Sequence, residues 1–308
     1  VYELFKSNAE LYDAEDTFLA FLMRGYASSG FWSPGRASVL VVTTQMDVSW
    51  VSIIPWGLAF TVFLALVNTG LLYGMIKRDP DRYPELEAKE GVVVDWKQVY
   101  ILLGLAVGLI LSIALLSIFT PWDLLIIVPI VSILFPIVAG LLQGKMPEYQ
   151  AGMKNYYHKS TIKVQGEVAL FTAAGFLSKA LELSGVGAMI PGLIPAWMPQ
   201  YPVLLVGSLM LLMVLPSLAG VHPVAVGTAL VATIVPASIG LTDMAFALTI
   251  ICGWAFAIQL SPFSAVSLIA GGLVNRMPWD ISLGLSGKYG FACIAIFSFI
   301  IAGINAIV

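Results

Sequence analysis

The feature that most constrains this chain is the length of its stretches without a charged residue. Between Glu182 and Asp243 there is no Asp, Glu, Lys or Arg, and further charge-free runs cover 48–76, 98–122, 124–144, 244–275 and 289–308. A helix of about 20 apolar residues crosses the roughly 30 Å hydrocarbon core of a bilayer. The runs therefore predict an all-α membrane protein with several transmembrane helices.

Composition leads to the same class. Hydrophobic residues make up 59% of the chain and charged residues only 11%, whereas soluble domains carry about 25% charged residues. The same numbers exclude a disordered chain, and the net charge of -3 gives no indication of a nucleic-acid partner. The sequence begins at Val1 without an initiator Met, so we expect an N-terminally truncated piece of a longer protein.

Prolines interrupt several of the apolar runs. Proline removes a backbone donor and clashes with the carbonyl four residues earlier, so it opens a helix. The run 201–238 is too short for two full crossings, and Pro216 and Pro223 divide it. We expect a re-entrant hairpin there, with its tip between these prolines, and a broken helix at Ser261–Ser264.

Two polar connections predict the orientation. Segments 77–96 and 144–164 are rich in charge and flank a helical hairpin, 97–143, whose tight turn is Thr120–Asp123. Both therefore lie on one side of the membrane as solvated loops, and their Lys and Arg residues make that side the cytoplasm. Following the chain from there leaves the C-terminus outside, and we expect a bacterial inner membrane protein.

A short internal repeat suggests how the chain is organised. The segment starting Ser33-Pro34-Gly35-Arg36 and the segment starting Ser261-Pro262-Phe263-Ser264 share a Ser-Pro, a small fifth residue and an apolar tail. The predicted topology gives them opposite orientations. Paired broken helices in inverted halves point to the binding site of a secondary transporter.

This pattern predicts five regions. They are the end of a first inverted repeat (1–76, a broken helix and a closing helix), a loop (77–96), a scaffold hairpin (97–143), a second loop (144–164) and the transport region of the second repeat (165–308).

With these features the chain resembles the ion transporter superfamily, and within it the divalent anion/sodium symporters. Those proteins have re-entrant hairpins, each followed by a helix that is unwound at a loop. The resemblance implies an external hairpin tip at Ser217, Leu218 and Ala219. It implies unwound loops at Ser261, Pro262, Phe263 and Ser264 and at Ser33, Pro34, Gly35 and Arg36, with the substrate bound by all three segments. It also implies a homodimer.

The chain departs from the family pattern at the tip, where Ser217 is kept but the family's Asn and Thr are absent. The loops also lack the family's double proline. The substrate class therefore stays open between a di- or tricarboxylate and an inorganic oxyanion.

Each candidate residue has a structural alternative. Backbone carbonyls near Ser33 and Ser261 can hold a coupling Na⁺, or the prolines that follow can be plain kinks. Arg36 near the membrane centre indicates pairing with an anion, unless its loop lies at an interface or it pairs with an acid elsewhere. His222 gates, carries a proton, or caps the second hairpin helix. Arg24 is expected nearer the cytoplasmic end, in a structural role.

No enzyme signature is present: the two histidines are far apart in sequence, and Cys252 and Cys293 form no metal-ligand or disulfide pattern. We predict a secondary active transporter that moves a small anion by alternating access, coupled to Na⁺ or H⁺, with no other cofactor. A block holding the three segments would move against the 97–143 hairpin. The alternatives are a Na⁺/H⁺ antiporter of the same superfamily and a non-transporting scaffold or channel subunit.

Overall fold

A computed structural model describes residues 15–46, 48–78, 96–160 and 194–307, with scattered positions between 169 and 184. All the regular structure in these residues is helical. Most of the predicted loop 77–96, the predicted crossing 167–184 and the start of the external segment after it lie outside the described residues.

Five described segments are long and apolar enough to cross a bilayer, so the predicted all-α class with transmembrane helices is confirmed at this level. They are α4 (Trp50–Arg78), α5 (Trp96–Phe119), α6 (Leu124–Leu142), the segment Asp243–Val274 and the segment Asp280–Asn305. The sequence is compatible with an integral membrane protein because each segment reaches about 28 Å or more at 1.5 Å per residue.

The chain divides into two compact units, one of 87–176 and the other of 1–86 with 177–308. The smaller unit contains α5, α6 and α7 (Met146–Ser160). Helices α5 and α6 meet where Gly108 faces the ring of Phe135, and Gly140 of α6 packs against Tyr149 of α7. The region expected as the loop 144–164 thus contains a polar helix of 15 residues.

The larger unit is built around α12 (Asp243–Leu260), which is buried along nearly its whole length. Helix α10 (Pro202–Leu218) and helix α14 (Leu285–Asn305) pack against it. A cluster of rings joins α12 to its neighbours, with centroids 4.8–6.1 Å apart: Phe31, Phe60, Phe256 and Phe297. Edge-to-face ring contacts of this kind stabilise a core beyond simple burial.

Two helices of the larger unit are interrupted. Helix α2 (Glu15–Ser28) passes through the short η1 (Ser29–Phe31) and resumes as α3 (Ala37–Gln45). Helix α12 ends at Leu260 and resumes as α13 (Ala265–Val274).

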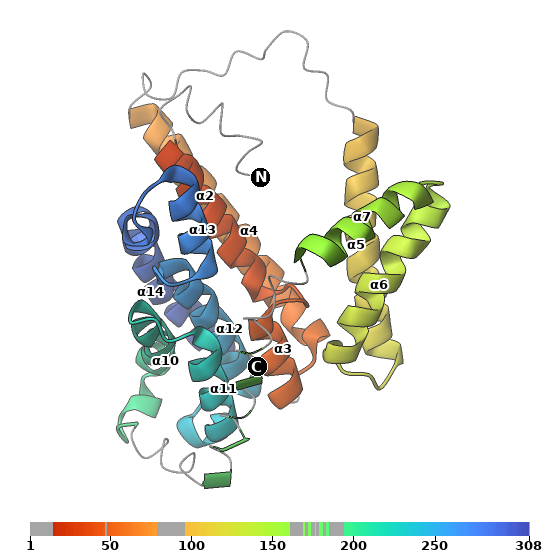
Figure 1. Cartoon of the computed structure of the whole chain (residues 1–308). Helices are drawn as coiled ribbons and strands as arrows, with labels where there is room; N and C mark the ends of the chain where they lie inside the picture. Colours follow the sequence, from red (N-terminus) through yellow and green to blue (C-terminus); the bar gives the residue numbers. More distant parts are fainter. Residues whose placement is uncertain are drawn as a thin grey trace. The chain divides into compact units, whose positions relative to one another are not determined.

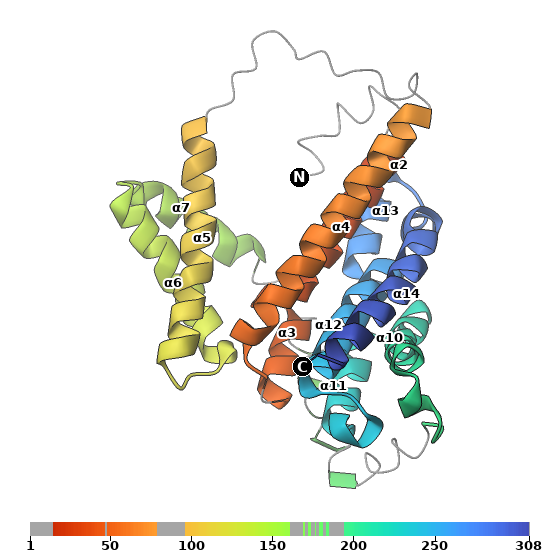
Figure 2. The same ribbon diagram turned by 180° about the vertical axis from the view of Figure 1, so that it is seen from behind.

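The two broken helices run in opposite directions (Figures 1 and 2). Contacts agree with this, because Leu19 and Met23 of α2 cluster with Ala270 of α13, whereas α3 contacts α12.

A close approach fixes α4 against the first break. A Cβ added at Gly57 of α4 would lie 2.4 Å from the carbonyl oxygen of Phe31, so only glycine fits. Beside it, Trp50 Nε1 donates to the carbonyl of Trp32 at 2.8 Å. The backbone around the first break is therefore held by α4.

The segment between α10 and the broken α12 forms a short helical hairpin. Helix α10 has 17 residues and α11 (Pro223–Thr233) has 11, so at 1.5 Å per residue they measure about 26 Å and 17 Å. The turn between them holds Gly220 at φ 91°, in the left-handed region. Helices α10 and α11 contact each other.

The last span begins earlier than its charge-free run. The charge-free run predicts a start at Tyr289, but helical structure begins at Pro278, passes through a π-helix, η7 (Asp280–Gly284), and continues into α14. The charged Lys288 lies in the first turns of α14 with its side chain exposed. A long amphipathic side chain can extend towards water, so one lysine does not end a helix here.

Candidate functional site

The hairpin tip and the second break are joined by a buried hydrogen bond. Ser261 Oγ donates to the backbone carbonyl of Ser217 at 2.6 Å. Ser217 Oγ donates to Val214 O at 2.6 Å and lies 3.3 Å from Ala257 O. The two serines are only 4% and 1% exposed. Two of the three predicted segments are therefore in direct contact, and we call this contact the tip–break junction.

Side-chain hydroxyls replace the helical partners that the second break removes. Ser261 Oγ accepts from the backbone N–H of Phe263 at 3.2 Å, and Pro262 between them has no N–H. Ser264 caps α13, accepting from Ser267 N at 3.2 Å and donating to Ser267 Oγ at 3.0 Å. The sequence Ser-Pro-Phe-Ser thus stabilises non-helical backbone inside an apolar chain.

The tip packs onto the same break. A Cβ at Gly220 would contact the ring of Phe263 at 3.7 Å, whereas Ala219 is exposed and Leu218 is half-buried. His222 is the N-cap of α11, with Nδ1 accepting from Val224 N at 3.1 Å. The geometry agrees with the capping alternative for His222, and its gating or proton role stays a prediction.

The first break has the same backbone hydrogen bonds as the second. Ser33 N donates to Ser29 O at 3.1 Å and Arg36 N to Ser33 O at 3.1 Å, as Ser261 N does to Ala257 O at 3.0 Å and Ser264 N to Ser261 O at 3.3 Å. Each following helix then begins in the same way, with Leu40 N donating to Arg36 O and Leu268 N to Ser264 O. The short sequence match thus corresponds to a matching local structure.

Arg36 folds back onto its own segment. Its Nε and Nη2 donate to Ser29 Oγ at 3.1 and 2.6 Å, and Nη2 also donates to Tyr26 O at 2.8 Å. The guanidinium carbon lies 3.9 Å from the centroid of the Tyr26 ring, which is itself 45% exposed. Arg36 is thus held at the edge of the unit, and its pairing with an anion stays a prediction.

The first break does not hydrogen-bond to the tip–break junction within the described residues. It packs against an earlier part of α12, where a Cβ at Gly30 would lie 3.4 Å from Ala255 Cβ. Ser261 is six residues further along α12, which is about 9 Å at 1.5 Å per residue. Ser33 is half-buried, Pro34 is buried and Gly35 is exposed. The convergence of all three segments on one ligand remains a prediction.

Two buried N–H donors near the breaks have no hydrogen-bond partner in the part of the chain that the structure describes. Gln259 Nε2 lies two residues before Ser261, and Trp32 Nε1 lies one residue before Ser33. Unpaired buried donors are costly and uncommon in folded proteins. Sequence reasoning missed both, although Gln259 is the one amide within the apolar run that precedes the second break.

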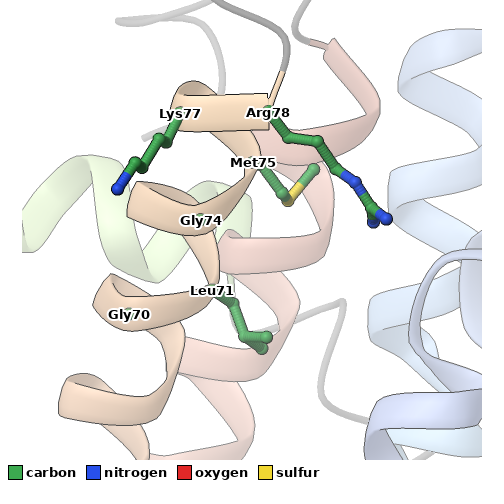
Figure 3. Close-up of a pocket in the computed structure, with 6 residues that line it drawn as sticks. All are labelled: Gly70, Leu71, Gly74, Met75, Lys77 and Arg78. Carbon is green, nitrogen blue, oxygen red and sulfur yellow. The ribbon is translucent and has the colours of Figure 1, made fainter.

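A surface hollow at the end of α4 is poorly suited to a small solute. It has a volume of about 500 Å³, and all its lining residues belong to the last turns of α4 (Figure 3). Lys77 and Arg78 project from opposite sides of that helix (Figure 3). Because a single helix supplies every wall, the hollow cannot enclose a ligand.

No three His, Cys, Asp or Glu side chains gather as a metal site among the residues described. Comparisons with protein-family models, with curated proteins and with solved structures find no match for this chain. Any functional assignment therefore rests on the geometry above.

Proposed function

We propose that this chain belongs to a secondary active transporter that moves a small anion across a membrane. The observation that carries the proposal is the pair of broken helices, which share one hydrogen-bond pattern and run in opposite directions within one unit. Non-helical backbone at membrane depth is tolerated where it is buried in protein or lines a wet cavity. Inverted repeats with discontinuous helices are typical of secondary transporters.

The short hairpin supports the same proposal. Helices α10 and α11 are each shorter than the roughly 30 Å core of a bilayer, so the pair suits a re-entrant hairpin better than two crossings. Its tip contacts the second break through Ser217 and Ser261. In this proposal the tip moves against the break and exposes the bound solute to each side in turn.

An anion fits the unpaired donors better than a cation does. Gln259 Nε2 and Trp32 Nε1 present N–H groups with no acceptor in the described chain, and an N–H can serve only an acceptor. Binding an oxyanion would satisfy them and offset the cost of their burial. Carbonyl groups of Ser33 and Ser261 each carry a second lone pair for a coupling Na⁺, and H⁺ is the other coupling ion proposed.

The wider assignment follows from the same features and from the resemblance. It comprises membership in the ion transporter superfamily, an inner-membrane location with 77–96 and 144–164 cytoplasmic, and a homodimer. A Na⁺/H⁺ antiporter receives no specific support, because α10 to α13 contain one carboxylate, Asp243, at the first residue of α12.

Uptake into proteoliposomes tests the proposal. Labelled succinate, citrate, phosphate and sulfate are offered with and without a Na⁺ or pH gradient, using the longest chain that contains this sequence. We expect gradient-dependent uptake of one of these anions, and uptake of none of them would favour a scaffold.

A matched pair of variants on α12 tests the site. Gln259→Ala removes the unpaired donor and should weaken apparent substrate affinity by about tenfold. Thr249→Ala removes a hydroxyl that is bonded to Ala245 O at 2.7 Å in its own helix, and should leave affinity unchanged. Equal affinities for the two variants would exclude Gln259 from the site.

A further inference from the structure

Arg24 lies inside the larger unit, in contact with two other helices. Its Nη1 donates to Asn68 Oδ1 at 3.3 Å and its Nη2 to the carbonyl of Leu285 at 3.2 Å. The guanidinium carbon is 4.1 Å from the ring centroid of Tyr289, and Asn68 Nδ2 donates to the Tyr289 hydroxyl at 3.1 Å. The groups that contact the guanidinium are uncharged, and the carboxylate of Asp16 lines the same cavity.

The position of Arg24 is deep. Asn68 lies ten residues before the end of α4 at Arg78, and Tyr289 lies nine residues after Asp280. At 1.5 Å per residue, both contacts are about 15 Å from the charged helix ends. The guanidinium is therefore set back from the charged ends of α4 and of the last span, although the exposed Lys288 directly precedes Tyr289.

This charge has no counter-ion within the described residues. Its Nε is buried and makes no hydrogen bond, and the nearby Asp16 is paired with Arg276. A charged side chain inside a membrane protein is normally paired, because an isolated one costs several kcal/mol, on the order of +2.5 or more. Arg24 therefore has no ion-pair partner of its own among the described residues.

The start of the last span contains two more unpaired polar groups, one of them on Ser286, directly after Leu285, whose carbonyl accepts from Arg24. Ser282 and Ser286 are 0% exposed and their hydroxyls have no hydrogen-bond partner. Buried hydroxyls elsewhere, such as that of Ser298, donate to the carbonyl four residues earlier. Positions 282, 286 and 289 share one helix face, and Ser282 belongs to the π-helix η7. Such π segments occur frequently at functional sites.

A cavity of about 180 Å³ lies beside Arg24. Residues of α2, α4 and α14 line it, among them Asp16, Arg24, Met75 and Leu285. Its size suits a phosphate group or a small carboxylate, and its walls include the Arg24 guanidinium, whose buried Nε lacks an acceptor among the described residues, and the Asp16 carboxylate, which is paired with Arg276.

We propose that Arg24 binds an oxyanion, with hydroxyls on the neighbouring face of α14 as further donors. The ligand is a carboxylate or phosphate group, which comes either from a free small anion or from the headgroup of a lipid. This site is separate from the tip–break junction, and binding there requires no transport.

Thermal stability of the purified protein tests the proposal in nanodiscs of neutral phosphatidylcholine, titrated with phosphate or citrate. We expect a saturable rise in the unfolding temperature. Arg24→Lys should weaken binding by about tenfold or more, because lysine loses the forked donor geometry. Lys288→Gln removes an exposed charge from the same helix and should leave the binding unchanged.

A second set of nanodiscs containing phosphatidylglycerol identifies the source of the ligand. If a lipid phosphate occupies the site, this lipid raises the unfolding temperature, the added anion has no further effect, and Arg24→Lys abolishes the rise. If a free anion occupies the site, the added anion raises the unfolding temperature in both kinds of nanodisc. Either result supports the site.

Other outcomes would overturn the proposal that Arg24 binds an oxyanion. One is no stabilisation by any anion or lipid, and another is equal stabilisation of the wild type and Arg24→Lys. Loss of binding in Gln259→Ala but not in Arg24→Lys would place the anion at the second break. If Arg24→Lys does not fold, Ser286→Ala takes its place, with an expected weakening of about threefold; unchanged binding in it refutes the site.

Discussion

Replacing Ser261 with alanine should separate the hairpin tip from the second break. The hydroxyl makes two bonds, one to Ser217 O at 2.6 Å and one from Phe263 N at 3.2 Å. In the variant, Ser217 O keeps a donor, since Gly220 N lies 3.2 Å from it. Phe263 N loses its acceptor. A hydrogen bond between helices in a membrane protein contributes about 0.6–1.7 kcal/mol, and a donor left unpaired costs about 1–3 kcal/mol.

The expected loss is therefore about 2 kcal/mol of unfolding free energy. Reversible unfolding by sodium dodecyl sulfate in mixed micelles measures it on the purified protein. Ser298→Ala is the matched control, because Ser298 is also buried but its hydroxyl bonds at 2.7 Å to Ile294 O within its own helix. That bond is local, so the control should lose about 0.5 kcal/mol or less.

The contrast between the two variants decides the result. If Ser261→Ala and Ser298→Ala lose the same amount, the Ser261 hydroxyl does not connect the tip to the break. The Ser217–Ser261 hydrogen bond would then not contribute to the proposed movement of the hairpin.

Three further substitutions test the surrounding geometry by the same unfolding assay. Gly57→Ala should cost about 3 kcal/mol, since its Cβ would overlap the backbone of Phe31, and a neutral result would contradict that close approach. Gly220→Ala should cost about 1 kcal/mol because φ is 91°, with Gly303→Ala, in an open position of α14, as a neutral control. His222→Ala should cost about 1 kcal/mol through loss of the α11 cap, whereas His222→Asn should retain most of the stability.

The spans and their interruptions were predictable because they depend on local chemistry. Charge-free length predicted α4 to within two residues at each end, since only a helix satisfies its backbone in an apolar solvent. The prolines at 34 and 262 predicted the two breaks, because a missing N–H and a ring clash act within one turn. Proline alone does not decide a break, however, because Pro129 and Pro136 lie inside the continuous helix α6.

The partners of the polar side chains were not predictable. The sequence does not show that Arg36 reaches back to Tyr26 or that Arg24 lies against Tyr289. A long side chain can extend in either direction from its Cα, and the acceptors of Arg24 are 44 and 261 residues away in sequence. Only the packing of α2 against α4 and α14 brings these acceptors to Arg24.

The π-helix at the start of α14 sets the rotation of everything that precedes it. An α-helix turns by 100° per residue and a π turn holds one residue more than an α turn, so regular α geometry over the same five residues would turn the preceding chain by about that angle. Arg276 would then move away from Asp16, and Ile281 would leave the cluster it forms with Leu19 and Ala270. A chain of the same length and hydropathy with a regular α-helix here would join α13 to α14 in the wrong direction.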